Sequence, residues 1–105
     1  MFEDNDLNGL LSLVSTGKFI LNIGSEEICP PCRRISPLFH ELKEKTDNIT
    51  FIKVDVQTNG DIAQHFNVSS IPHFISIHNG EKVSEFKGAN EAKLRETIEE
   101  LNNLN

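Results

Sequence analysis

The only two cysteines of this 105-residue chain, Cys29 and Cys32, enclose two prolines in the segment SEEICPPCRR. A C-x-x-C spacing serves as a metal clip, as a structural cross-link, or as a reversible dithiol–disulfide pair. Residues three apart in a helical turn lie within reach of a disulfide, so the spacing permits redox cycling without backbone rearrangement. Spacing alone leaves these alternatives open, and the rest of the chain must decide among them.

Neither a metal clip nor a staple fits the rest of the sequence well. A closed tetrahedral site needs two further ligands, and the histidines available show no finger-like spacing. We assign them to surface or half-buried packing: His40, His65, His73 and His78. Two cysteines in one short segment also cannot cross-link distant parts of a secreted scaffold. We therefore predict a redox pair without a metal ion or cofactor, and keep a metal site, including a cluster bridged between two chains, as the alternative.

The prolines and the start of a helix give the two cysteines different roles. Pro30 and Pro31 suit the first positions of a helix, where amide groups lack intrahelical partners. The helix dipole and the Cys32 N–H then favour the thiolate of Cys29. We expect Cys29 to be the nucleophile and Cys32 the resolving thiol. Pro30 and Pro31 tune the pair, because neither donates a hydrogen bond nor carries a charge.

Charges of both signs flank the pair. Glu26 and Glu27 oppose a thiolate, and Arg33 and Arg34 support it. Exposed charges of this kind move a pKa by about one unit at most, so we expect them to cancel largely. Moderate thiolate stabilisation predicts a reducing pair, because strong stabilisation makes a disulfide oxidising.

The whole chain indicates one folded domain, residues 1–105. Hydrophobic residues make up 37% of it and charged residues 25%, as in a globular protein. The net charge of −6 argues against a nucleic-acid partner. No apolar run approaches the ~20 residues that span a bilayer, and the acidic start MFEDND is unlike a secretory signal. We expect a cytoplasmic monomer that uses neither a membrane nor a nucleic acid.

Hydrophobic periodicity predicts helices and strands in alternation, and so an α/β fold. Asp6 caps a first helix that ends before Gly17, and Asn79-Gly80 predicts a hairpin turn. Pro37 predicts a kink in the second helix. The remaining elements are a strand at 18–24, a helix at 32–45, a strand at 49–56, a helix at 60–66, strands at 73–78 and 82–86, and a helix from Asn90. Cys29 then lies at the carboxyl end of a parallel strand, where open α/β sheets bind their ligands.

Four stretches in order resemble thioredoxins, in particular eukaryotic ones, over nearly the whole chain: CPPCRRISPLFHELKEK, FIKVDV, FNVSSIPHF and NGEKVSEFKGANEAKLRETIEEL. The resemblance implies a thioredoxin fold, with a central mixed sheet of four to five strands flanked by four helices. It implies that Pro72 is a cis-proline facing the disulfide and that the Ile71 backbone pairs with a bound substrate strand. Gly88 and Ala89 match the family's glycine loop, where a partner's backbone approaches.

The chain departs from the family's pattern near the cysteines. Ile28 replaces the usual Trp, which changes the contact surface for partners, and Pro30-Pro31 replaces Gly-Pro. The link LNIGSEEIC is one residue longer and puts Asn22 where the family has a buried Asp that assists proton transfer. Asn cannot accept a proton near neutral pH, so we expect slower resolution by Cys32. Lys53 matches a family lysine near the same site and can influence the local charge.

These observations predict a thiol–disulfide oxidoreductase that works mainly as a protein-disulfide reductase. Its partners would be disulfide-containing proteins and a thioredoxin-reductase-like electron donor. One alternative is a weakly catalytic or non-catalytic module that binds partners in the same groove, which the missing carboxylate at Asn22 favours. A further alternative is an isomerase or oxidase, which the absence of a cation within the C-x-x-C disfavours. It stays open whether MFED forms an edge strand before the first helix.

Overall fold

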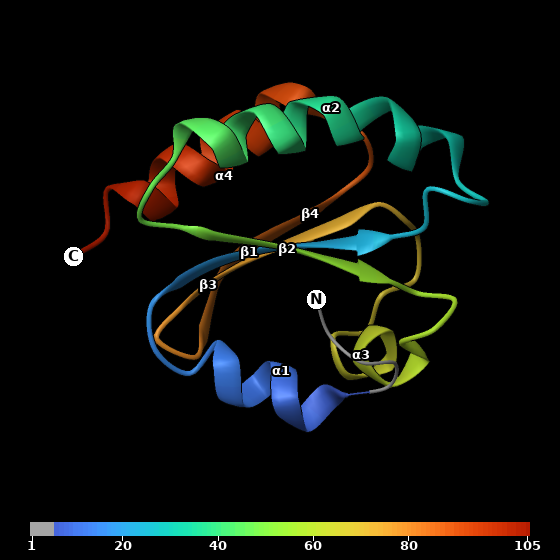
Figure 1. Ribbon diagram of the computed structural model, residues 1–105, viewed down its shortest axis with the longest axis horizontal. Helices are drawn as coiled ribbons and strands as arrows, with labels where there is room; N and C mark the ends of the chain where they lie inside the picture. Colours follow the sequence, from blue (N-terminus) through green and yellow to red (C-terminus); the bar gives the residue numbers. More distant parts are fainter. Residues whose placement is uncertain (1–5) are drawn as a thin grey trace.

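The helices and strands follow one another in the predicted order in residues 6–105, which are the residues that the computed structural model describes (Figure 1). The predicted bounds hold to within one or two residues. The elements are α1 (Leu7–Leu13), β1 (Lys18–Gly24), α2 (Pro30–Lys45), β2 (Thr50–Asp55), α3 (Gly60–His65), β3 (His73–His78), β4 (Glu81–Lys87) and α4 (Glu91–Asn102).

One mixed sheet runs through the middle of the molecule, with strand order β2-β1-β3-β4. The β1 and β2 strands are parallel, whereas β1–β3 and β3–β4 are antiparallel. The parallel pair needs a crossover, and α2 supplies it. The predicted mixed α/β sheet is therefore confirmed with four strands in residues 6–105. The edge strand considered for MFED lies outside the described residues.

The β3–β4 hairpin turns at Asn79-Gly80, as the sequence predicts. Both residues have positive φ, 51° and 85°, which is the backbone of a type I′ turn. Asn79 also ties the turn to the segment before β1, because its Oδ1 accepts from the Gly17 N–H at 2.8 Å and its own N–H donates to the Gly17 carbonyl at 2.9 Å.

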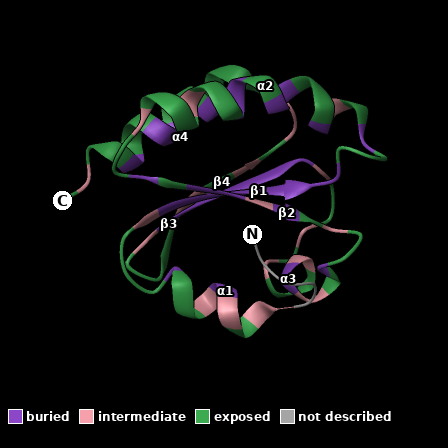
Figure 2. Ribbon diagram, in the orientation of Figure 1, coloured by how far each residue is buried: buried purple, intermediate pink, exposed green. Residues whose placement is uncertain are grey.

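Helices cover both faces of the sheet, α1 and α3 on one side and α2 and α4 on the other (Figure 1). Alternate residues of β1 face opposite layers, so Leu21 packs with the α1 and α3 side while Ile20 packs with α2 and α4. This is why KFILNIG is apolar almost throughout, and Figure 2 shows the strand buried along its length. Lys18 at the start of the strand is partly buried, and Asn22, 7% exposed, is the polar residue buried within it.

The second helix begins earlier than the sequence predicts. It starts at Pro30 instead of Cys32, because the two prolines occupy the first two helical positions and need no hydrogen-bond donor there. The helix continues past Pro37 to Lys45, and the predicted kink stays a prediction. No helix in residues 6–105 has the length and apolar character needed to cross a membrane.

Candidate active site

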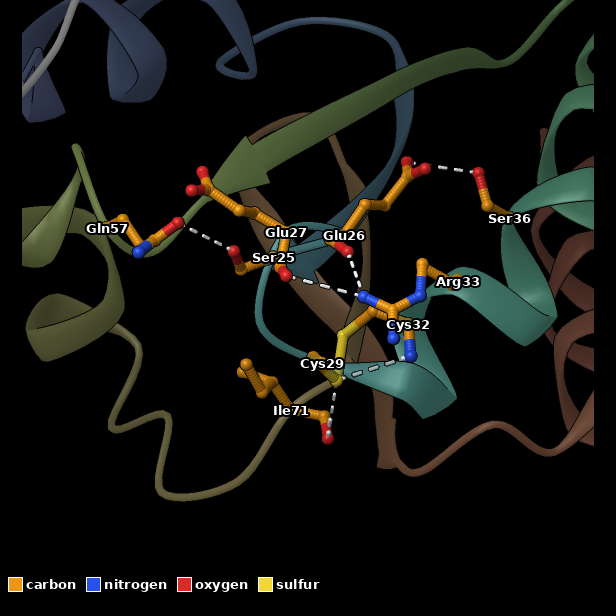
Figure 3. The surroundings of a disulfide bond; sticks show 9 residues. All are labelled: Ser25, Glu26, Glu27, Cys29, Cys32, Arg33, Ser36, Gln57 and Ile71. Atoms are coloured by element: carbon orange, nitrogen blue, oxygen red, sulfur yellow. Dashed lines mark hydrogen bonds between the residues drawn. A yellow bond between two sulfur atoms is a disulfide. The ribbon is translucent and has the colours of Figure 1, made fainter.

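Cys29 is the N-cap of α2, and Cys32 lies in the first turn of that helix. The two form a disulfide with their Cα atoms 5.2 Å apart (Figure 3). The Cys32 N–H donates to the Cys29 sulfur at 3.2 Å, so the helix start stabilises negative charge on that atom. This is the geometry expected from the sequence. Both residues are buried, with Cys29 6% and Cys32 4% exposed.

The segment before β3 brings a backbone carbonyl to the outer sulfur. The Ile71–Pro72 peptide bond is cis, as the resemblance implies. The Ile71 carbonyl oxygen lies 3.8 Å from the Cys29 sulfur, as Figure 3 shows. A disulfide sulfur carries no proton, so this is a contact in the oxidised form, and the thiol of the reduced form can donate to the same oxygen.

Gly88 joins this segment from the end of β4. Its N–H donates to the Pro72 carbonyl at 2.8 Å, so the proline segment and the glycine loop are tied together beside Cys29. Gly88 has φ +94°, a backbone that only glycine adopts without strain, and an added Cβ would meet open space. Ala89 packs against the core beneath α2 and α4, and Ile28 is 58% exposed. The Ile71–Pro72 segment and Gly88 are therefore joined beside Cys29, and Ile28 is exposed directly before it in sequence.

A pocket of about 310 Å³ lies on the other side of the pair, behind Cys32. Asn22, Cys32 and Lys53, which the sequence places in one functional group, all line it. The other lining residues are Gly24, Ser25, Glu26, Glu27, Val54, Asp55, Thr58 and Asn59. Several of the lining side chains are polar or ionisable, and the pocket is large enough for several water molecules, so it can carry a proton between Cys32 and solvent.

Glu26 anchors a cluster on the wall of this pocket. Its carboxylate forms an ion pair with Lys53 and accepts a hydrogen bond from the Ser36 hydroxyl at 3.0 Å. The Lys53 ammonium also lies 2.8 Å from Ser36 Oγ and 3.2 Å from His40 Nε2. The Lys53 hydrogen bond lowers the pKa of Glu26, and the Ser36 hydrogen bond and the charges of Lys53 and His40 act in the same direction, against the effect of burial. The sequence singled out Lys53 but missed its partners.

The four charged residues next to the two cysteines differ in their contacts. They are therefore not the two equivalent acids and two equivalent bases whose effects on the thiolate the sequence leads us to expect to cancel largely. The Arg33 guanidinium donates to the backbone carbonyls of Glu26 at 2.7 Å and Glu27 at 3.3 Å (Figure 3). Within residues 6–105, the Glu27 carboxylate and the Arg34 guanidinium make no hydrogen bond or ion pair. Glu26 and Arg33 are therefore held by local contacts, whereas Glu27 and Arg34 are exposed.

The histidines do not gather around a common centre. His40 contacts Lys53. The ring centroids of His65 and Phe66 lie 4.8 Å apart, and the Nε2 atom of His78 lies 3.3 Å from the side-chain amide nitrogen of Asn79. His73 is only 2% exposed, and its Nε2 contacts Glu85 Oε1 at 3.1 Å, so its assignment to surface or half-buried packing was wrong. No group of three or more potential metal ligands occurs in the part of the chain that the structure describes.

Comparisons with known proteins agree with this geometry. The sequence model of the thioredoxin family matches residues 14–100. Thioredoxins of Gallus gallus and Homo sapiens are each 47% identical over 73 residues, which cover 70% of this chain and of theirs. The crystal structure of reduced Schistosoma mansoni thioredoxin pre-protein is 40% identical and superposes with a TM-score of 0.83, over 96% of this chain and 94% of that one. The chain therefore belongs to the thioredoxin family, and its Cys29–Cys32 pair is the dithiol–disulfide centre of a protein-disulfide reductase.

Proposed function

We propose that Cys29 attacks the disulfide of a partner protein and that Cys32 then releases the partner. In the first step the Cys29 thiolate bonds to one partner sulfur, and the other partner sulfur leaves as a thiolate. In the second step the Cys32 thiolate attacks the Cys29 sulfur, so the mixed disulfide breaks and the partner is left reduced. The observation that carries this order is the Cys32 N–H donating to the Cys29 sulfur at 3.2 Å, which favours a thiolate at Cys29.

The surface around Cys29 is where we place the substrate. The Ile71 carbonyl points at the outer sulfur, and its position before Pro72 suits pairing with an extended partner segment. Gly88 carries no side chain that would obstruct such a segment, Ala89 supports the loop from the core, and Ile28 offers an apolar contact.

The pocket behind Cys32 is where we place proton transfer in the second step. Cys32 must lose a proton before it attacks, and Asn22 cannot accept one. Water in the pocket then serves as the acceptor, and the ammonium of Lys53 on the pocket wall favours a thiolate at Cys32. Pro30 and Pro31 leave the outer thiolate with the single donor from Cys32, which supports a reducing pair.

Reduction of insulin by the dithiol form tests the proposal, with Cys29→Ser and Cys32→Ser as matched variants. Turnover is expected to disappear in both. Cys32→Ser should still attack and so accumulate a covalent complex with insulin that dithiothreitol releases, whereas Cys29→Ser should trap nothing. A complex that forms with Cys29→Ser instead would reverse the two roles. Partner binding by a wild-type protein that shows no turnover would favour the interaction module.

The cellular setting completes the proposal. Electron transport from a thioredoxin-reductase-like enzyme would return the pair to the dithiol after each cycle and so contribute to redox homeostasis. A cytoplasmic location is supported by cysteines that form one exchangeable pair instead of bracing distant segments. A monomer is supported by the placement of the exposed large hydrophobic residues in residues 6–105, since Leu13 and Ile28 lie on separate elements. Cell fractionation and light scattering would test these two points.

A further inference from the structure

The link between β1 and Cys29 is a single closed turn. The Cys29 N–H donates to the Ser25 carbonyl at 3.0 Å, which closes a loop around Glu26, Glu27 and Ile28. The Ser25 hydroxyl donates to Gln57 Oε1 at 3.0 Å, so the start of the turn is also fixed to the segment after β2. The end of the turn is fixed by Cys29 itself, which caps α2.

The side chains of Arg33 and Glu26 hold the middle of this turn, and we call these two residues the clamp. Arg33 reaches back from α2 to the carbonyls of Glu26 and Glu27, at 2.7 and 3.3 Å. The Glu26 side chain extends the other way, to Lys53 on β2 and to Ser36 on α2. Figure 3 shows the Glu26 and Glu27 side chains diverging, with Glu26 directed at Ser36. The turn is therefore attached to two different elements.

The residue that this turn presents is Ile28. Its side chain is 58% exposed directly before Cys29, although an isoleucine is ordinarily buried. In residues 6–105, Leu13 at the end of α1 is the other exposed large hydrophobic residue. An apolar side chain held beside a reactive sulfur by fixed backbone is a preorganised contact, because a partner that covers it need not pay the entropy of ordering the turn.

We propose that Arg33 and Glu26 are positioning residues that fix Ile28 as a docking contact for protein partners with an apolar side chain next to their disulfide. This inference rests on the proposed function. Arg33 and Glu26 do not touch the reacting sulfurs in this arrangement. Their effect through Ile28 is on the recognition of protein disulfides, and a small disulfide that does not reach Ile28 is reduced without the help of Arg33.

The chain supplies matched controls for this idea, because each clamp residue has a neighbour of the same type outside the clamp. Arg33→Met is compared with Arg34→Met, and Glu26→Gln with Glu27→Gln. We expect both clamp variants to raise KM for insulin about three- to ten-fold, the range set by ordering one or two side chains on binding, and kcat to stay nearly constant in Arg33→Met. Reduction of a small aromatic disulfide should change less than two-fold in Arg33→Met and Arg34→Met, because neither residue lines the pocket behind Cys32.

A double variant separates positioning from a general structural effect. Ile28→Ser should raise KM for insulin by itself, and Arg33→Met should add little in that background, since the contact it positions is gone. Additive effects of the two changes would overturn the proposal, as would equal KM values for Arg33→Met and Arg34→Met. Thermal unfolding of each variant checks that the fold is intact. A wild-type protein that reduces neither substrate would refute the proposed function itself, which is a distinguishable result.

Discussion

The two sides of the disulfide differ in the groups that surround the sulfur atoms, which are backbone groups on one side and side chains on the other. On the Cys29 side the groups near the sulfur are backbone groups, the Ile71 carbonyl at 3.8 Å and the Cys32 N–H at 3.2 Å. On the Cys32 side a pocket of about 310 Å³ is lined by side chains, several of them ionisable, and the buried Asn22 is among them.

This difference decides which step depends on individual side chains. Backbone groups are set by the fold, so the attack by Cys29 on a partner depends on geometry that a substitution rarely alters. Side chains can be exchanged one at a time, and the pocket lining includes the amide of Asn22 and the carboxylate of Glu26. The resolving step is therefore where this protein is expected to differ in rate and in pH dependence.

Gly24 lies between the two sides, and filling it should have the largest effect. A Cβ there would stand 2.8 Å from the Cys32 sulfur and 3.7 Å from the Pro72 Cα. Gly24→Ala should cost about 1–3 kcal/mol by overpacking. The disulfide holds the sulfur in place while a free thiol can rotate away, so the oxidised form suffers more. We expect the redox potential to rise by about 20–60 mV, measured against glutathione.

Gly60→Ala is the control for this measurement, because a Cβ at Gly60 would meet nothing within 4 Å. An unchanged redox potential in Gly24→Ala would show that the residues around the Cys32 sulfur move to accommodate the added methyl group. The two sides of the disulfide would then be packed less closely than the contact distances indicate.

Restoring a carboxylate on the pocket side should have the next largest effect. Asn22→Asp supplies a base beside Cys32, and we expect release of the mixed disulfide to accelerate about ten-fold at neutral pH, less than the full contribution of a positioned base because water already serves. Burial of a carboxyl raises its pKa, so the acceleration should be lost as pH falls through that value. Stopped-flow release from a trapped complex measures both. An unchanged rate and pH profile would contradict the role given to Asn22.

Gly88 tests the partner side by itself. At φ +94° an alanine should destabilise the protein by about 1 kcal/mol through its backbone alone, because a Cβ meets open space there. Such a loss lowers the thermal midpoint by about 4–8 °C. We expect KM for a protein disulfide to rise while the potential stays constant, in contrast to Gly24→Ala. Gly60→Ala again serves as the control, and a shift of the potential in Gly88→Ala would show that the two sides are coupled.

The smallest effect concerns the charge cluster on the pocket wall. Lys53 lowers the pKa of Glu26 below its ordinary value of 4.5, so the ion pair stabilises the folded state above that value and is lost as pH falls through the lowered pKa. The side chains are partly exposed, and screening limits the contribution to under about 1 kcal/mol. Glu26→Gln should therefore be less stable than wild type at pH 7 in urea titrations and equal to it near pH 2. A difference that persists at pH 2 would assign the effect to packing.

Most of the fold was predictable because the signals are local. The Asn79-Gly80 turn fixed the hairpin through its positive φ values, and Asn90 caps α4 with its side chain on the Lys93 N–H at 3.0 Å. The start of α2 was placed two residues late, at Cys32, although Pro30 and Pro31 suit the first two helical positions and occupy them.

The site was predictable in its centre and less so at its margins. Cys29, Cys32 and Pro72 are carried by motifs, and the structure brings them together. The roles of Glu26 and Arg33 were missed, because a run of charges reads as a solvated surface until the fold shows which of them reach a partner.

The sequence by itself predicted the chemistry, because the C-x-x-C before a helix, the absence of finger-like histidine spacing and the four thioredoxin-like stretches together favour thiol–disulfide exchange. It also determined the alternation of elements, through periodicity and turn residues. Only the tertiary structure decided which charged side chains contact one another. Glu26 pairs with Lys53, 27 residues away in the sequence, and His73 contacts Glu85 between β3 and β4. Periodicity reports which face of an element is buried, whereas the partner of a particular side chain depends on how distant elements pack.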